Sequence, residues 1–302
     1  MWLTIVLFLL PGLVLFGLLV LLPILIAGYL SFFKWNGLGG LPEPGSDRFI
    51  GLQNFERLLS DEIFMGDLRH MVILIVLSLL IQLPLSLGLA LLLNQKMRGR
   101  ALYRTIFFAP YVLSEVITGV LFTMVFSPEH GLVNSLLTAI GLEGAAAEWL
   151  ADPDTVLYSL FAVITWKYFG FHMILYLAGR QGIPNELLEA AAIDGANAWR
   201  QFWHVTLPLL GPTIRMSVFL SIIGTIQLFD LVWVLTRGGP VHASETMAVT
   251  MYIFGFERNQ FGYASAISVA MFLISLVFAL GYQRWVMRRD TEGAITTMRD
   301  QR

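Results

Sequence analysis

The sequence contains no cysteine, and charged residues are scarce. Without cysteine, a disulfide-stapled scaffold, a thiol nucleophile and a cysteine-ligated metal site are all excluded. The 19 basic and 21 acidic residues make up 13% of the 302 positions, which is about half the share of charge in an average soluble protein. This is too little charge to cover the surface of a soluble domain. A net charge of −2 also gives no indication of nucleic-acid binding.

Long apolar runs are abundant instead, and the charged residues avoid them. Only Glu115, Lys167 and Asp230 fall inside the six longest runs. Each run reaches the ~20 residues that a membrane-spanning helix needs, and none alternates in polarity as a barrel strand does. We therefore predict an all-α, polytopic membrane protein that forms a single transmembrane domain over residues 1–302. Its six predicted spans are residues 3–33, 71–95, 105–128, 155–179, 216–236 and 259–283.

The first run, residues 1–33, could also be a cleaved signal peptide. It has no basic amino-terminal region, and its apolar part is about twice as long as that of a signal peptide. We therefore expect a spanning helix. Pro11, Pro23 and Pro84 lie inside predicted spans, where membrane helices tolerate the kinks that proline causes.

The distribution of basic residues predicts the orientation. An even number of spans places both termini on the same side of the membrane. The tails and loops on that side carry 12 lysines and arginines, whereas the opposite loops carry 6. Because basic loops are retained in the cytoplasm, we expect both termini to be cytoplasmic. The opposite loops contain 13 of the acidic residues and should face outward.

One cytoplasmic loop, residues 180–215, is far longer than the 2–8 residues that usually connect packed helices. We expect Asn185 to cap a first short helix and Gly195 to end it in a left-handed turn. Pro208 and Pro212 should then redirect the chain into the fifth span.

A second helix of this loop should carry bulky side chains at helical spacing and fix the loop to the helix bundle. These side chains are Trp199, Phe202, Trp203 and Val205. An amphipathic helix that lies on the lipid surface is an alternative, because tryptophan and phenylalanine beside arginine are typical of one.

The same loop resembles a known family. Glu189-Ala190-Ala191, Gly195, Val205 and Leu207-Pro208 match the EAA signature of permease subunits in ATP-binding-cassette (ABC) importers. Only Val205 departs from the signature, which usually has isoleucine there. Flanking segments such as residues 51–55 and 236–240 resemble the carbohydrate-uptake branch, which serves oligosaccharides and glycerol phosphates. The likeness extends over nearly the whole chain and is closest to the larger-type permease subunit of maltose-like systems.

The resemblance implies a type I ABC importer permease in the bacterial inner membrane. Such a subunit forms a sugar channel with a second permease. Two cytoplasmic ATPase subunits bind ATP and Mg²⁺, and an extracytoplasmic solute-binding protein delivers the substrate. In the family, the EAA loop, residues 183–212 here, is a coupling helix that contacts the ATPase. This role carries over to Glu189, Ala190, Ala191, Asp194, Gly195 and Ala196.

The residues themselves agree that any ATP binds elsewhere. The sequence contains no G-x-x-x-x-G-K-[ST] phosphate-binding loop. The five histidines are scattered, without an H-E-x-x-H motif, and no G-x-S-x-G nucleophile elbow occurs. We therefore expect no cofactor, no metal and no catalytic residue on this chain, and we disfavour an intramembrane enzyme.

The predicted fifth span offers a substrate path. Ser221, Gly224, Thr225 and Leu228 follow an i, i+3, i+4, i+7 spacing, which places them on one helix face. The resemblance to the maltose permease implies polar sugar contacts at these serine, threonine and leucine positions. Leu228 departs from the amide expected there. The alternative is that small and hydroxylated residues only pack the helices together.

Further substrate-path candidates come from the fourth span and from one neighbouring residue. The resemblance implies an aromatic sugar contact at Phe171 and a small residue where this chain has Tyr168. Gln227 lies one position from the polar face and is a weaker candidate.

The three charges inside spans need an explanation, because each costs ~2.5–3.5 kcal/mol at a helix centre. Glu115 and Lys167 fall near the middle of their predicted spans, and we expect them to form an ion pair. Asp230 lies nearer the outer end of its span. A proton path through Glu115 and Asp230, in a secondary transporter, is the alternative function.

Overall fold

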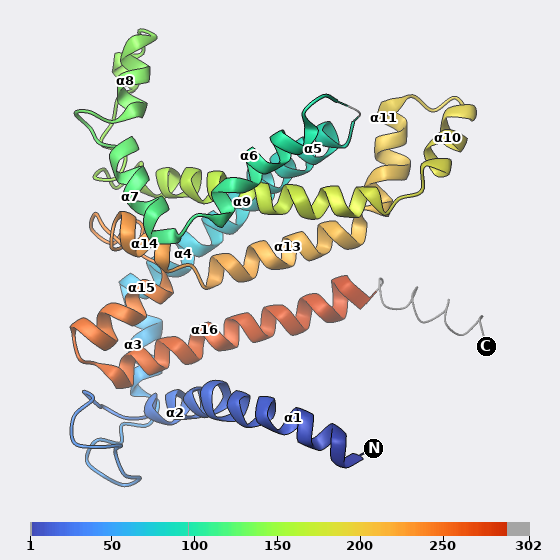
Figure 1. Ribbon diagram of the computed structural model, residues 1–302. Coiled ribbons are helices and arrows are strands. Elements are labelled where there is room, and N and C mark those ends of the chain that lie inside the picture. The colour runs from blue at the N-terminus through green and yellow to red at the C-terminus, as the bar shows by residue number, and fades with distance from the viewer. Residues whose placement is uncertain (1, 96, 289–302) are drawn as a thin grey trace. The chain divides into compact units, whose positions relative to one another are not determined.

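A computed structural model describes residues 2–95 and 97–288. In these residues, helices joined by loops make up the fold (Figure 1), and there is one isolated antiparallel bridge, between Phe33 and Phe49. The predicted all-α fold is therefore confirmed. Helices suit an apolar surrounding because they satisfy their backbone hydrogen bonds internally. Lys96 and the arginines after Arg288, which contributed to the predicted orientation, lie outside the described residues.

The bounds of the α-helices are as follows: α1 Trp2–Phe16, α2 Leu22–Leu30, α3 Gln53–Ser60, α4 Glu62–Leu77, α5 Leu83–Asn94, α6 Arg100–Val112, α7 Glu115–Val125, α8 Leu132–Ala139, α9 Val156–Gln181, α10 Asn185–Ile193, α11 Ala198–Gln201, α12 Leu207–Leu209, α13 Gly211–Ile226, α14 Asp230–Leu235, α15 Met247–Tyr252 and α16 Phe261–Tyr282. Some helices are joined or extended by π-helical turns, at Gly17–Leu21, Ser78–Gln82, Phe202–Thr206, Ile253–Glu257 and Gln283–Met287.

The described helices fit six membrane spans. Four continuous stretches are long and apolar enough to cross a bilayer: Phe8–Leu30, Glu62–Asn94, Val156–Gln181 and Phe261–Met287. Two bent pairs supply the others, if each pair is one span. The pair α6 and α7 is bent by 98°, and the segment from α11 to α12 is bent by 66° from α13.

Two of the predicted spans are not the continuous helices that their apolar composition suggested. The third breaks at Leu113 and Ser114, whose ψ angles of 144° are extended rather than helical. The fifth ends as a helix at Ile226, and α14 begins only at Asp230. Both broken stretches are mostly apolar and contain one charged residue each, so hydrophobicity did not indicate the breaks. The bend that Pro208 and Pro212 predicted, before α13, is present.

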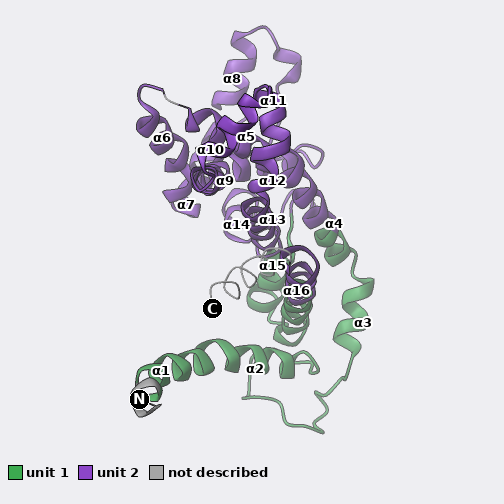
Figure 2. Cartoon of the chain, turned by 90° about the vertical axis from the view of Figure 1, so that its right-hand side faces the viewer, with its two compact units in different colours: residues 1–68, 245–275 green, residues 69–244, 276–302 purple. Residues whose placement is uncertain are grey.

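The described residues form two compact units (Figure 2). Unit 1 comprises those of residues 1–68 and 245–275, and unit 2 comprises those of residues 69–244 and 276–302. Unit 1 is held together partly by buried polar contacts. The amide of Asn54 in α3 donates to the backbone carbonyls of Ser31 and Phe33, just past the end of α2, at 2.8 and 3.1 Å. The hydroxyl of Thr250 in α15 donates to Asp67 of α4 at 2.6 Å.

Helix α9 is the central element of unit 2. Its 26 residues rise ~39 Å, enough to cross the ~30 Å core of a bilayer. Side chains of α5 and α9 form a buried apolar cluster, made of Ala90, Leu93, Met173, Tyr176 and Leu177. Gly170 lets α6 pack directly on α9, because a Cβ atom there would lie 1.9 Å from the carbonyl oxygen of Phe107. The close crossing of α6 and α9 therefore requires glycine.

Candidate functional site

One face of α9 forms a wall of a cavity in unit 2. Ile164, Tyr168, Phe171 and His172 follow each other at helical spacing, so they share this face. The cavity has a volume of about 260 Å³, close to the lower end of the range typical of small-molecule sites. Its other lining residues come from three further segments: Ser78, Gln82, Tyr111, Leu220, Ser221, Gly224, Thr225 and Leu228.

Most of the substrate-path candidates meet in this cavity. Six of them line it: Tyr168, Phe171, Ser221, Gly224, Thr225 and Leu228. Gln227 does not line it and is exposed at the carboxyl cap of α13. Leu228 reaches the cavity from the break between α13 and α14, because the helix has already ended.

Other lining residues were not among the sequence candidates. These are Ser78, Gln82, Tyr111, Ile164, His172 and Leu220. Ser78 and Gln82 did leave a signal, since they are two of the few polar residues in the apolar run 71–95 and lie four positions apart. Tyr111, Ile164 and Leu220 resemble ordinary apolar residues of a span, and only the tertiary structure assigns them to the cavity.

Aromatic rings form one part of the lining. The rings of Tyr111 and Phe171 are stacked, with centroids 4.9 Å apart and an interplanar angle of 23°. Tyr168 meets Tyr111 edge-on at 6.1 Å. Binding sites combine such apolar and aromatic surfaces with a few polar groups that fix the orientation of the ligand. The cavity therefore offers a flat aromatic surface beside hydrogen-bonding side chains.

The polar part of the lining consists of hydroxyl, amide and imidazole groups. The hydroxyl oxygens of Ser78 and Ser221 are 2.8 Å apart, and the Ser78 hydroxyl donates to the side-chain oxygen of Gln82. The Nδ1 atom of His172 lies 2.7 Å from the hydroxyl oxygen of Ser217. No lysine, arginine, aspartate or glutamate is among the lining residues. The site is thus built to hydrogen-bond a ligand and does not offer it a charged side chain.

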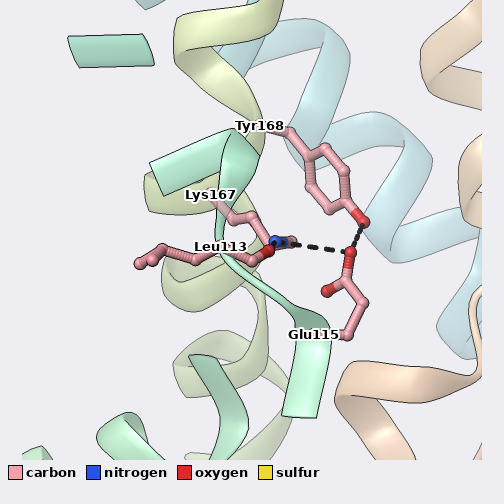
Figure 3. Close-up of polar contacts among 4 residues, drawn as sticks. All are labelled: Leu113, Glu115, Lys167 and Tyr168. Carbon is pink, nitrogen blue, oxygen red and sulfur yellow. Dashed lines mark hydrogen bonds and ion pairs between the residues drawn. The ribbon is translucent and has the colours of Figure 1, made fainter. Parts of the chain in front are cut away.

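An ion pair lies beside the cavity (Figure 3). The Lys167 ammonium is 3.5 Å from a carboxylate oxygen of Glu115, and the Tyr168 hydroxyl donates to the same oxygen at 2.7 Å. The Lys167 side chain is only 1% exposed, whereas that of Glu115 is 28% exposed. The structure therefore brings together the two residues that we expected to pair.

Lys167 also explains how the break between α6 and α7 is tolerated. Lys167 donates to the backbone carbonyl of Leu113 at 2.5 Å (Figure 3). That carbonyl lies at the break, where an unpaired polar group would be costly in an apolar surrounding. Glu115 is not in the middle of a helix, as its position in the third run suggested, but is the first residue of α7. An acidic residue is favourable at such a helix start.

The third charge behaves differently. Asp230 is exposed and is the first residue of α14. No basic side chain of the described residues lies within 4.0 Å of it.

The long loop folds into α10 and α11, which lie beyond the carboxyl end of α9 (Figure 1). Gly195 follows α10 with φ +81°, and the next amide, that of Ala196, donates back to Ala191. The predicted left-handed end of this helix is confirmed. The predicted cap was wrong, because Pro184 occupies the capping position and Asn185 is already helical. Asn197 is the residue that caps, and its side chain accepts from the amide of Arg200 in α11.

A few large apolar side chains of this loop are exposed. No residue of α10 is buried, and Ile193 and Trp199 are 87% and 68% exposed. The expectation that the aromatic residues fix the loop to the bundle is not met by Trp199, which is 68% exposed. The rings of Trp199 and Trp203 meet edge-on with centroids 5.6 Å apart, and Trp203 is 47% exposed. The EAA residues therefore lie on a surface that is open to a partner.

No group of three or more histidine, aspartate or glutamate residues that could hold a metal ion occurs in the described part of the chain.

Comparisons with known proteins agree with this architecture. The family model described as "binding-protein-dependent transport system inner membrane component" matches residues 82–289. The chain is similar to a probable ABC transporter permease protein of Pyrococcus horikoshii, with 37% identity over 93% of this chain and 94% of the relative. It is also similar to the lactose transport system permease protein of Rhizobium radiobacter, with 36% identity over 90% of each.

Solved structures give the same result. The chain is similar to a subunit of a bacterial ABC transporter that imports the acidic polysaccharide alginate, with a TM-score of 0.82 and 26% identity over 95% of this chain and 96% of that one. A second structure of an alginate ABC transporter, in complex with an alginate pentasaccharide-bound periplasmic protein, has the same TM-score and identity and covers 96% of this chain and 95% of that one.

Proposed function

We propose, for a chain that belongs to the family of binding-protein-dependent transport system inner membrane components, that it carries an uncharged sugar or oligosaccharide through the unit 2 cavity. The chain is a multi-pass permease subunit of an ABC importer in the inner membrane and is a transport subunit, not an enzyme.

The composition of the cavity lining carries the proposal on the substrate. The lactose permease relative transports a neutral sugar, whereas the alginate importer carries an acidic one, so family membership does not decide the charge. In this chain no lysine or arginine lines the cavity. A carboxylate or phosphate that entered would lose its hydration without gaining a counter-charge.

The aromatic and hydroxyl groups of the lining support a carbohydrate in particular. The stacked rings of Tyr111 and Phe171 provide a flat apolar surface for one face of a sugar ring. The hydroxyls of Ser221 and Thr225 and the amide of Gln82 can exchange hydrogen bonds with sugar hydroxyls. The sugar would therefore bind through the combination that small polar ligands require.

Coupling to ATP hydrolysis is proposed for the exposed α10 loop. Glu189, Ala190, Ala191, Asp194, Gly195 and Ala196 would contact a cytoplasmic ATPase subunit. Four of them, Glu189, Ala190, Asp194 and Gly195, are exposed and none is buried, which supports the proposal, as does the exposed apolar side chain of Ile193 beside them. ATP and Mg²⁺ would be held by two such ATPase subunits, because the sequence has no phosphate-binding loop.

The remaining partners follow the same division of labour. A second permease subunit would complete the channel as a heterodimer, and an extracytoplasmic solute-binding protein would deliver the sugar. Both termini would be cytoplasmic, as the excess of basic residues on that side predicts. The proton-coupled alternative is not retained, because Glu115 is engaged by Lys167 and Tyr168.

The substrate proposal is tested with the assembled transporter in proteoliposomes. Neutral disaccharides (lactose, maltose, cellobiose and trehalose) are compared with acidic analogues such as lactobionate, and each uptake rate is divided by the occupancy of the solute-binding protein. This ratio removes the selectivity of the binding protein. We expect ATP-dependent uptake of at least one neutral sugar and a much lower ratio for its acidic analogue. Equal ratios would contradict the proposed substrate class.

The coupling proposal is tested by Gly195→Val, with Gly45→Val as the matched control. Both glycines have positive φ, +81° and +85°, and both have open space where a side chain would go. The backbone strain is therefore similar, but only Gly195 lies in the α10 loop. We expect Gly195→Val to leave assembly of the permease pair intact and to lower uptake per ATP hydrolysed about tenfold or more. Similar uptake per ATP in the two variants would rule out the coupling role.

A further inference from the structure

The π-helical turn Ser78–Gln82 places two polar side chains on the cavity. The turn lies between α4 and α5, inside the candidate membrane span Glu62–Asn94. Ser78 and Gln82 are only 3% and 2% exposed, and both line the cavity. Turns of this kind are frequent at functional sites. The backbone of the turn is satisfied locally, since the Ser86 hydroxyl donates to the carbonyl of Gln82 at 2.7 Å.

A directed chain of hydrogen bonds fixes the side chain of Gln82. The Ser78 hydroxyl donates its one proton to the side-chain oxygen of Gln82. Ser221 must then donate to Ser78 across the 2.8 Å contact between their hydroxyl oxygens, because a serine hydroxyl has a single proton. The chain thus runs from Ser221 through Ser78 to Gln82.

This chain of hydrogen bonds leaves the side-chain amide nitrogen of Gln82 available to a ligand. Its oxygen is already an acceptor, so the –NH₂ group with two donors remains. No hydrogen bond to this nitrogen is present among residues 2–95 and 97–288. A buried amide donor normally has a partner. Leu228 lines the same cavity, but its apolar side chain cannot supply the amide that the resemblance to the maltose permease led us to expect at that position.

We infer that Gln82 is a substrate-binding residue that donates its amide hydrogens to one hydroxyl oxygen of the transported sugar. Ser78 is the positioning residue that orients this amide. The inference rests on the proposed function and adds a contact from the span formed by α4 and α5. The sugar would thereby be held between this span, α9 and α13, rather than by α9 and α13 alone.

The experiment pairs a variant of the residue with the removal of single sugar hydroxyls. Uptake is measured in proteoliposomes with the complete transporter, for whichever of lactose, maltose, cellobiose and trehalose the wild type carries, and for its monodeoxy analogues. Each rate is again divided by the occupancy of the binding protein. In the wild type, one analogue should be transported roughly 3- to 10-fold less well than its parent, the effect of one lost hydrogen bond. Gln82→Met, which keeps the length of the side chain but has no donor, should remove the preference at that hydroxyl alone.

Two further variants separate binding from folding. Ser86→Ala removes a buried hydroxyl of α5 that donates to the turn but does not line the cavity, and it should keep the wild-type pattern. Ser78→Ala frees the amide to rotate and should weaken the preference at the same hydroxyl. If Gln82→Met merely disturbed the fold, uptake of all analogues would fall together with the pattern unchanged, and the role of Gln82 would be refuted. If the wild type carried none of the neutral sugars, the proposed substrate class would fall, and the role of Gln82 with it.

Discussion

Neutralising Glu115 should cost more stability than removing both charges of its ion pair. Glu115→Gln keeps a side-chain oxygen that can accept from Lys167 and Tyr168, so the change removes the counter-charge and little else. The Lys167 ammonium, 1% exposed, would then be a buried charge without compensation. Such a charge costs ~2.5–3.5 kcal/mol at the centre of a membrane helix. A loss of about 3 kcal/mol lowers the ratio of folded to unfolded protein roughly 100-fold.

The double variant Glu115→Gln with Lys167→Met should recover part of this loss. It removes the stranded ammonium, and the main remaining defect is the Leu113 carbonyl, which loses the donor that Lys167 provides at 2.5 Å. One unpaired carbonyl costs ~1–3 kcal/mol. We therefore expect the double variant to be about 1–2 kcal/mol more stable than Glu115→Gln alone, because breaking a buried pair costs more than replacing it.

The assay is a thermal and SDS titration of the assembled transporter in mixed micelles, followed by the fraction that stays monodisperse. Lys34→Met is the control, because Lys34 is exposed and surface changes usually stay within ~0.5 kcal/mol. A double variant that is less stable than Glu115→Gln would refute the reasoning. So would a Glu115→Gln variant as stable as the control.

Two packing predictions have controls of their own. Gly170→Ala should destabilise the chain by ~1–3 kcal/mol in the same titration, because its Cβ atom would lie 1.9 Å from the carbonyl oxygen of Phe107. The control Gly88→Ala has open space around the new Cβ atom and should be neutral or stabilising. Equal effects of the two changes would contradict the close crossing of α6 and α9. Asn54→Asp should lower the melting temperature, because it replaces the amide that donates to two backbone carbonyls. The control Asn36→Asp should not, because the Asn36 side chain only accepts a hydrogen bond, from the amide of Leu38. A similar melting temperature for both variants would contradict the role of the Asn54 amide.

The broad architecture followed from composition, because the bilayer makes hydrophobicity decisive. A run of about 20 apolar residues can hardly be anything but a spanning helix. Local turn chemistry was also readable, as the left-handed Gly195 after α10 and the bend around Pro208 and Pro212 demonstrate. These features depend on single residues and their immediate neighbours.

The breaks within the spans were not readable in this way. Leu113 and Ser114 take extended backbone within a run that is apolar enough to predict one continuous helix. The break is tolerated because Lys167, 54 positions away, donates to the exposed carbonyl. The capping of α10 was likewise misassigned, since Asn185 and Pro184 are both plausible at a helix start, and only the backbone geometry distinguishes them.

By itself, the sequence determined that this chain is a helical membrane protein with a long loop of EAA type, because those properties are written in residue type and spacing. Tertiary structure alone decided which side chains share the cavity. Ser78 and Ser221 are 143 positions apart and lie within hydrogen-bonding distance, and Tyr111 of α6 stacks on Phe171 of α9. Such meetings depend on how bent helices cross. A periodic pattern can place a residue on a face of its own helix, but it cannot show which other helix that face meets.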